Sequence, residues 1–222
     1  MKKRKETNIM GGRGASVPSA TPGGGGGGDL LMDAMPGNPK TLADALGKQG
    51  RPMSISRAVL GANPFYNNQY GDYSMNCQRV VQTTEARFRG YDVIASPTYK
   101  GDTMPNHGNW AKGFKGAKIE NVGHFTPNAT QKALESKMKN YGDGSRAVMS
   151  VQWKGRNSGG HVINVIQKNG KTYYYDGQVG KTYSGKDLFK AIQTKKTEIT
   201  RVDNLDFSDN ARKAFRQNPK KK

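Results

Sequence analysis

The chain has 222 residues and a formal net charge of +19, from 36 basic and 17 acidic residues. This length is enough for one domain of ordinary size. The mean hydropathy of −0.84 is too low for the whole chain to be packed, so part of it is expected to be disordered. The single cysteine excludes an internal disulfide framework and a cysteine-rich zinc site. No apolar run reaches membrane-spanning length. The excess positive charge favours contact with a polyanion, such as nucleic acid or an acidic protein.

Residues 1–53 are expected to form a disordered, glycine-rich basic tether. The six glycines Gly23–Gly28 cannot bury enough surface to offset the entropy lost on ordering. Residues 41–47 interrupt this composition with a short apolar stretch that opens with a capping-box pattern. The stretch is either a docking peptide or a transient helical turn in a linker, and its surroundings favour the turn.

A folded domain is expected over residues 54–207, and its most informative stretch is 76–90. Apolar side chains recur there at helical steps: Cys77, Val80, Val81, Thr84 and Phe88. The pattern predicts a helix capped by Asn76 or Ser74 and ended by Gly90.

Cys77 lies in the first turn of this helix. The free N–H groups and the positive end of the helix dipole stabilise a thiolate there, and the thiolate is the nucleophilic form of cysteine. A lone cysteine is more often a small buried apolar side chain. Position alone therefore favours a structural role for Cys77. A catalytic role requires a base and an orienting acid elsewhere in the chain.

The chain after this helix predicts an α+β fold. A long irregular segment, residues 96–125, is expected to line or cover a substrate groove. The expected regular elements are a strand at 91–95, a helix at 128–141, strands at 147–153, 161–167 and 171–176, a helix at 184–192 and a strand at 197–202. Residues 208–222 are expected to be a basic C-terminal tail.

Asn169-Gly170 separates two strand-like runs and predicts a tight hairpin. With these two residues as the turn, the register places His161 and Asp176 on the same face of neighbouring strands, as diagonal neighbours with Cβ atoms roughly 7 Å apart. A carboxylate beside an imidazole can fix its tautomer and stabilise its charged form. Cys77, His161 and Asp176 are therefore predicted to form a nucleophile, a base and an orienting acid.

Four further residues are expected to line the site or to help bind an oxyanion: Gln69, Asn76, Trp153 and Gln178. The other histidines, His107 and His124, have no metal-ligand spacing with each other or with Cys77, so neither a metal nor another cofactor is expected.

Several of these segments together resemble the papain-like fold toxin family, which includes glutamine deamidase-type domains of bacterial and phage-associated proteins. The resemblance is carried by residues 76–79, 85–93, 160–165 and 175–178, with Asn63-Pro64 as a further match. It covers roughly residues 54–207. It implies a papain-like domain, in which the cysteine begins a helix packed on an antiparallel sheet that carries His161 and Asp176. Val80 departs from the family, where a second cysteine is common.

The resemblance implies amide hydrolysis on a protein substrate, most simply glutamine deamidation by a toxin or effector domain. The same machinery would serve a protease or, with an amine acceptor, a transglutaminase. A noncatalytic basic virion or nucleic-acid-binding protein is the rival hypothesis, because it accounts for the charge. Met1–Lys5 is basic, but no apolar segment follows it, so a Sec signal peptide is not expected. A cytoplasmic, virion-associated or target-cell location is expected instead.

Overall fold

A computed structural model describes residues 39–66, 73–98, 108–155 and 159–219. Its centre is an antiparallel sheet in which the strand order is β2-β7-β3-β4-β5-β6. These strands are β2 (Glu120–Asn121), β3 (Arg146–Gln152), β4 (Gly160–Lys168), β5 (Lys171–Asp176), β6 (Lys181–Tyr183) and β7 (Glu198–Arg201). The helices are α2 (Leu42–Leu46), α3 (Ile55–Leu60), α4 (Cys77–Phe88), α5 (Pro127–Tyr141) and α6 (Gly185–Ala191), with short 3-10 turns η1 (Asn109–Gly113), η2 (Thr194–Lys196) and η3 (Asp209–Lys213).

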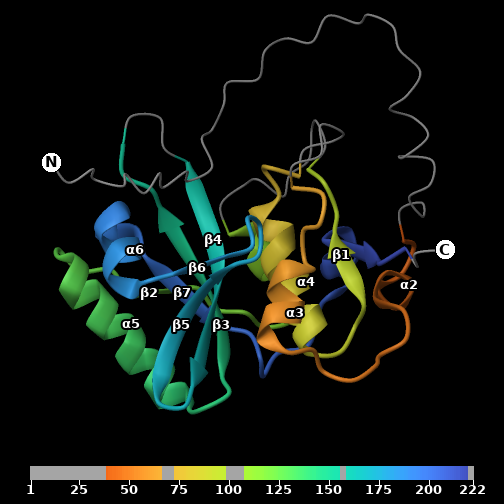
Figure 1. Cartoon of the computed structure of the whole chain (residues 1–222), viewed down its shortest axis with the longest axis horizontal. Coiled ribbons are helices and arrows are strands. Elements are labelled where there is room, and N and C mark those ends of the chain that lie inside the picture. Colours follow the sequence, from red (N-terminus) through yellow and green to blue (C-terminus); the bar gives the residue numbers. More distant parts are fainter. Residues whose placement is uncertain (1–38, 67–72, 99–107, 156–158, 220–222) are drawn as a thin grey trace, which may run out of the picture.

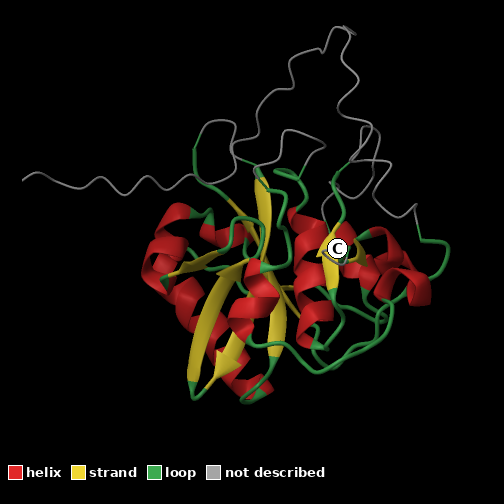
Figure 2. Cartoon of the chain, turned by 45° about the vertical axis from the view of Figure 1, so that its right-hand side comes forward, coloured by secondary structure: helices red, strands yellow, loops and turns green. Residues whose placement is uncertain are grey.

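Helices cover both faces of this sheet. α5 and α6 lie on one side, and α3 and α4 lie on the other (Figure 1). Successive side chains along each strand point to opposite faces of the sheet, so each strand contributes to two separate cores. Met149 and Ile163 pack in the core that contains Leu134 of α5, whereas Val148 and Val162 pack in the core that contains Val81 of α4. Figure 2 shows the same arrangement, with the strands between two groups of helices.

The β4–β5 hairpin has the predicted turn and register. Asn169 and Gly170 both have positive φ, at 52° and 72°, which is the conformation that a two-residue type I′ turn requires. Lys168 lies opposite Lys171, and the pairing continues without a slip to Asn164 opposite Tyr175. Residues at the far end of β4 therefore lie beside the end of β5, as the sequence predicted.

α4 is buried almost all round, although its sequence predicted only one apolar stripe. Polar side chains of the other faces are also enclosed, among them Arg79, Glu85 and Arg87. Arg87 donates to the carbonyl oxygens of Ala58 and Val93. Because each charge meets a carbonyl or an opposite charge, a helix with a polar face can occupy the centre of the fold.

Glu85 is the acidic centre of this buried set. Its side chain is 0% exposed and accepts from Arg89 Nε at 2.9 Å and from Arg146 Nε and Nη2 at 2.7 and 2.9 Å. The ion pair with Arg146 connects α4 to the first residue of β3.

Replacement of Glu85 by glutamine is expected to lower the free energy of unfolding by about 3 kcal/mol, because two arginines lose their buried counter-charge. Urea unfolding measures the change. Asp209→Asn is the matched control. Its ion pair with Arg212 joins a carboxylate that is 73% exposed, so its loss should cost about 0.5 kcal/mol. Equal effects of the two substitutions would contradict this account.

The folded part of the chain extends beyond the expected domain, residues 54–207, at both ends. α2, inside the expected tether, has the full capping box at Thr41 and Asp44, and its Ala45 packs with Phe215 in a core cluster. β8 (Phe215–Gln217), inside the expected basic tail, pairs with β1 (Val93–Ala95) in a separate two-stranded sheet. Apolar side chains from the two distant segments pack against each other, which neither stretch reveals alone. Residues 1–38 of the expected tether lie outside the described residues.

The expected irregular segment at 96–125 contains η1 and the short strand β2 among its described residues. Within the described ranges, no helix has both the length and the apolar character needed to cross a membrane.

Candidate active site

Cys77 is the first residue of α4, and its side chain is partly buried. The N–H groups of Arg79 and Val80 donate to the Asn76 carbonyl, at 2.8 and 3.0 Å, which closes the first turn directly after the cysteine. The thiol therefore lies at the end of the helix where N–H groups lack intrahelical acceptors. This is the local environment that the sequence predicted.

Asn76 does not cap the helix through its side chain. Its amide nitrogen instead donates to Asn63 Oδ1 at 3.0 Å and to the Ser96 carbonyl at 3.1 Å. Asn63 in turn donates to the carbonyls of Tyr73 and Gln178. A buried network of amides thus fixes the segment that leads into Cys77. Asn76 belongs to this network and does not line the pocket beside the thiol, which corrects its expected place.

His161 and Asp176 form a hydrogen-bonded pair. His161 Nε2 lies 2.8 Å from Asp176 Oδ2, and both side chains are almost fully buried. The other carboxylate oxygen accepts from the backbone N–H of Gln178 at 3.0 Å. Tyr183 donates its hydroxyl to Oδ2 at 3.2 Å. Three donors therefore hold the carboxylate in one orientation toward the imidazole.

The environment favours the charged form of both partners. Burial by itself would lower the pKa of His161, but the charge of Asp176 and hydrogen bonds to Asp176 and Cys77 raise it well above 6.5. Burial would likewise raise the pKa of Asp176, but the charge of His161 and the hydrogen bonds from His161, Gln178 and Tyr183 lower it below 3.8. The pair is therefore an imidazolium and a carboxylate over the acidic and weakly acidic range.

This pair should contribute most to stability between about pH 4 and pH 6.5. The contribution of His161, with its raised pKa, is complete below 6.5 and is lost as pH rises through that raised value. The contribution of Asp176, with its lowered pKa, is complete above 3.8 and is lost as pH falls through that lowered value. Urea unfolding of the wild type and of Asp176→Asn across this range measures the difference. A difference that does not change with pH would contradict the assignment.

Cys77 and His161 meet at one pocket. Both line a cavity of about 230 Å³, together with Gln78, Trp110 and Ser150, and Cys77 is close enough to the imidazole to help raise the pKa of His161. Because Nε2 is bonded to Asp176, Nδ1 is the ring nitrogen available to the thiol. The arrangement places a thiol beside an imidazole that is hydrogen-bonded to a carboxylate, which is the set of groups required for nucleophilic catalysis with an assisting base.

Trp153 forms a wall behind the imidazole. Its ring stacks on that of His161, with centroids 5.7 Å apart and an interplanar angle of 28°. The ring of Tyr183 also packs on Trp153, tilted by 60° and with ring centroids 6.1 Å apart. The stack limits rotation of the imidazole, so its two nitrogens stay directed at Cys77 and Asp176.

Gln178 lies behind the site, although it was expected to line the site. Its side-chain amide donates to the Ser74 carbonyl at 2.6 Å, and its backbone N–H holds Asp176. The preceding Gly177 lies against α4, where an added Cβ would come within 2.9 Å of Val80. This glycine therefore lets the end of β5 approach the helix that carries Cys77.

The sequence analysis missed the positioning roles of Asn63 and Tyr183. Asn63-Pro64 was noted only as a family match, and Tyr183 occupies an ordinary strand position. Neither residue has a local signal for its role. Asn63 bonds to Tyr73, Asn76 and Gln178, which belong to other segments, and Tyr183 reaches Asp176 from the neighbouring strand. Gln69 and His107 lie outside the described residues. His124 accepts through its carbonyl from Thr194 and is not among the residues that line the pocket.

Residues 75–181 match the family model described as "Papain fold toxin 1, glutamine deamidase". This segment is therefore similar to the papain fold toxin family. The match begins two residues before Cys77 and includes His161 and Asp176. Neither the curated proteins nor the solved structures gave a match.

The family assignment confirms the fold class expected from the sequence, a papain fold that combines helices with an antiparallel sheet. It also supports an enzyme of the hydrolase or deamidase kind. The described residues outside 75–181 add the helices α2, α3 and α6, the strands β7 and β8 and the turns η2 and η3 to the matched segment.

Proposed function

We propose that this protein is a cysteine-dependent deamidase that converts glutamine side chains of a target protein to glutamate. Cys77 is the nucleophile, His161 is the general acid and base, and Asp176 orients the imidazole. The observation that carries the proposal is that the imidazole of His161 is hydrogen-bonded to Asp176 and lines the same pocket as Cys77, within a segment matched by a glutamine deamidase family.

The reaction begins when the thiolate of Cys77 attacks the carboxamide carbon of the substrate glutamine. A carbon–sulfur bond forms, and the carbonyl oxygen becomes an oxyanion that N–H groups at the start of α4 can stabilise. The imidazolium of His161 gives its proton to the departing nitrogen, the carbon–nitrogen bond breaks, and ammonia leaves. A thioester to Cys77 remains.

Water completes the cycle. His161, now neutral, takes a proton from a water molecule that attacks the thioester carbon. The carbon–sulfur bond breaks, and the products are a glutamate side chain and the free Cys77 thiolate. The net reaction consumes one glutamine and one water and releases one glutamate and one ammonia. It requires no metal and no organic cofactor.

The protein is proposed to act as a toxin or effector domain of a bacterium or phage, on a protein target in another cell. The description of the matching family names a toxin, and the net charge of +19 would favour adsorption to an acidic target. This activity also accounts for the free thiol, which a purely structural basic protein does not need.

The test compares wild-type protein and Cys77→Ala after incubation with lysate of a candidate target cell. Deamidation predicts ammonia release and glutamines that become glutamates by mass spectrometry, with no new chain ends, in the wild-type sample alone. New chain termini would indicate a protease, and glutamines joined to amines would indicate a transglutaminase. DNA binding that falls steeply with salt, without any Cys77-dependent product, would favour the nucleic-acid-binding hypothesis.

A further inference from the structure

A second and larger cavity lies at the end of α4 opposite Cys77. Its volume is about 660 Å³, and none of its lining residues lines the pocket beside the thiol. Phe88 and Arg89, at the C-terminal end of α4, form part of its wall. Since the helix rises 1.5 Å per residue, this cavity begins roughly 16 Å from the cysteine. We call it the distal groove.

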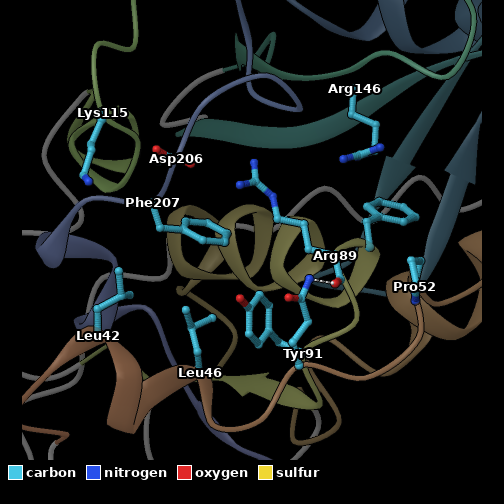
Figure 3. Close-up of a pocket in the computed structure, with 11 residues that line it drawn as sticks. Leu42, Leu46, Pro52, Arg89, Tyr91, Lys115, Arg146, Asp206 and Phe207 are labelled. Carbon is cyan, nitrogen blue, oxygen red and sulfur yellow. Dashed lines mark hydrogen bonds between the residues drawn. The ribbon is translucent and has the colours of Figure 1, made fainter.

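The floor of the distal groove is apolar. It is built from aliphatic and aromatic side chains of four separate segments: Leu42, Leu46, Pro52, Phe88, Tyr91 and Phe207. Figure 3 shows Leu46, Tyr91 and Phe207 around a common space with Arg89 beside them. Such a surface suits side chains of the size of leucine or phenylalanine.

Two arginines are held rigidly at this floor. The guanidinium of Arg89 lies 4.6 Å from the ring centre of Phe207, and that of Arg146 lies 5.5 Å from the ring centre of Phe88. The fully buried carboxylate of Glu85 forms ion pairs with both arginines. Arg89 also donates through Nη2 to the Val202 carbonyl. In the described part of the chain its Nη1 has no hydrogen-bond partner.

The rim adds further positive charge. Lys115 lines the groove and is exposed. Lys48 and Arg51 are also exposed, and in the chain they are adjacent to the lining residues Gln49 and Pro52, respectively. Asp206 is the one acidic residue among those that line the groove. Basic groups therefore outnumber acidic ones around an apolar floor.

We propose that the distal groove binds a peptide segment of a protein partner in which acidic side chains flank large apolar ones. The apolar side chains occupy the floor, and the carboxylates meet Arg89, Arg146 and Lys115. Nucleic acid fits less well, because a phosphate backbone has no large apolar side chains to bury on this floor. The proposal is independent of the deamidase activity.

A random peptide library displayed on phage, panned against the full-length chain, tests the proposal. Enriched peptides should combine aspartate or glutamate with leucine or phenylalanine. A synthetic, fluorescein-labelled copy of an enriched peptide should bind Lys115→Glu about tenfold more weakly, by fluorescence anisotropy. Lys118→Glu is the matched control, because Lys118 is exposed but does not line the groove, and it should bind like the wild type.

Leu42→Ser tests the apolar floor separately and should also weaken binding about tenfold, with its folded state checked by circular dichroism. Cys77→Ala should bind the peptide normally, which separates this site from the catalytic one. The proposal is overturned if no acidic and apolar peptides are enriched, or if Lys115→Glu and Lys118→Glu bind them equally. Displacement of the peptide by a short DNA duplex, with the duplex sensitive to Lys115→Glu, would also overturn it and indicate a nucleic-acid site.

Discussion

Replacement of Cys77 by serine should lower ammonia release from a glutamine-containing peptide by at least about a thousandfold. Serine has nearly the same size, so the packing at the start of α4 is kept. Its hydroxyl, however, does not ionise near neutral pH, whereas a thiol beside an imidazolium can supply a thiolate. The measurement is kcat/KM by coupled ammonia detection.

Alkylation gives an independent measure of the same thiol. Cys77 is the single cysteine of the chain, so iodoacetamide at neutral pH should add one label and abolish the activity. His161→Ala should slow this labelling, because the thiolate loses its charged partner. A serine variant that retains wild-type activity, or labelling that is indifferent to His161, would contradict Cys77 as the nucleophile.

Asp176→Asn should lower kcat by about a hundredfold to ten-thousandfold. Oδ1 of Asp176 accepts from the Gln178 backbone N–H, so the oxygen of the new amide should keep that position. Its NH₂ group then faces His161 Nε2, which must accept a hydrogen bond. The imidazole consequently carries its proton on Nδ1, toward Cys77, and can no longer accept the proton of the thiol.

Tyr183→Phe is the matched control for this change. It removes one donor to Asp176 Oδ2 but leaves the carboxylate, so kcat should fall by less than about tenfold. The pH dependence of kcat separates the two variants: Asp176→Asn should shift the profile of His161 to lower pH, because the imidazolium loses its carboxylate. Equal losses in both variants with unchanged profiles would indicate that Asp176 acts only in packing.

Features governed by short-range rules were predicted correctly from the sequence. The apolar spacing around Cys77 predicted a helix with this residue in its first turn, and the structure begins α4 at Cys77. Asn169-Gly170 predicted the turn, and because side chains alternate along strands, the turn alone set the register that places His161 beside Asp176. The histidine–carboxylate pair was therefore a local inference, although its members are fifteen positions apart in the chain.

Features that depend on distant partners were not predictable in this way. The sequence assigned residues 208–222 to a tail, because β8 is only three residues long and gains its stability by pairing with β1. The polar residues of α4 were expected outside the core, because the partners of Glu85 and Arg87 lie on other segments. Asn76 was expected to cap the helix but bonds instead to Asn63 and Ser96.

The sequence by itself determined that Cys77 lies in the first turn of a helix and that His161 pairs with Asp176, because nearest-neighbour geometry decides both. Only the tertiary structure decided that the thiol and the imidazole share a pocket, since that meeting depends on how α4 packs against β4. The close approach at Gly177 and the buried amides of Asn63 and Asn76 hold these elements together. Such contacts join residues far apart in the chain, and no local pattern encodes them.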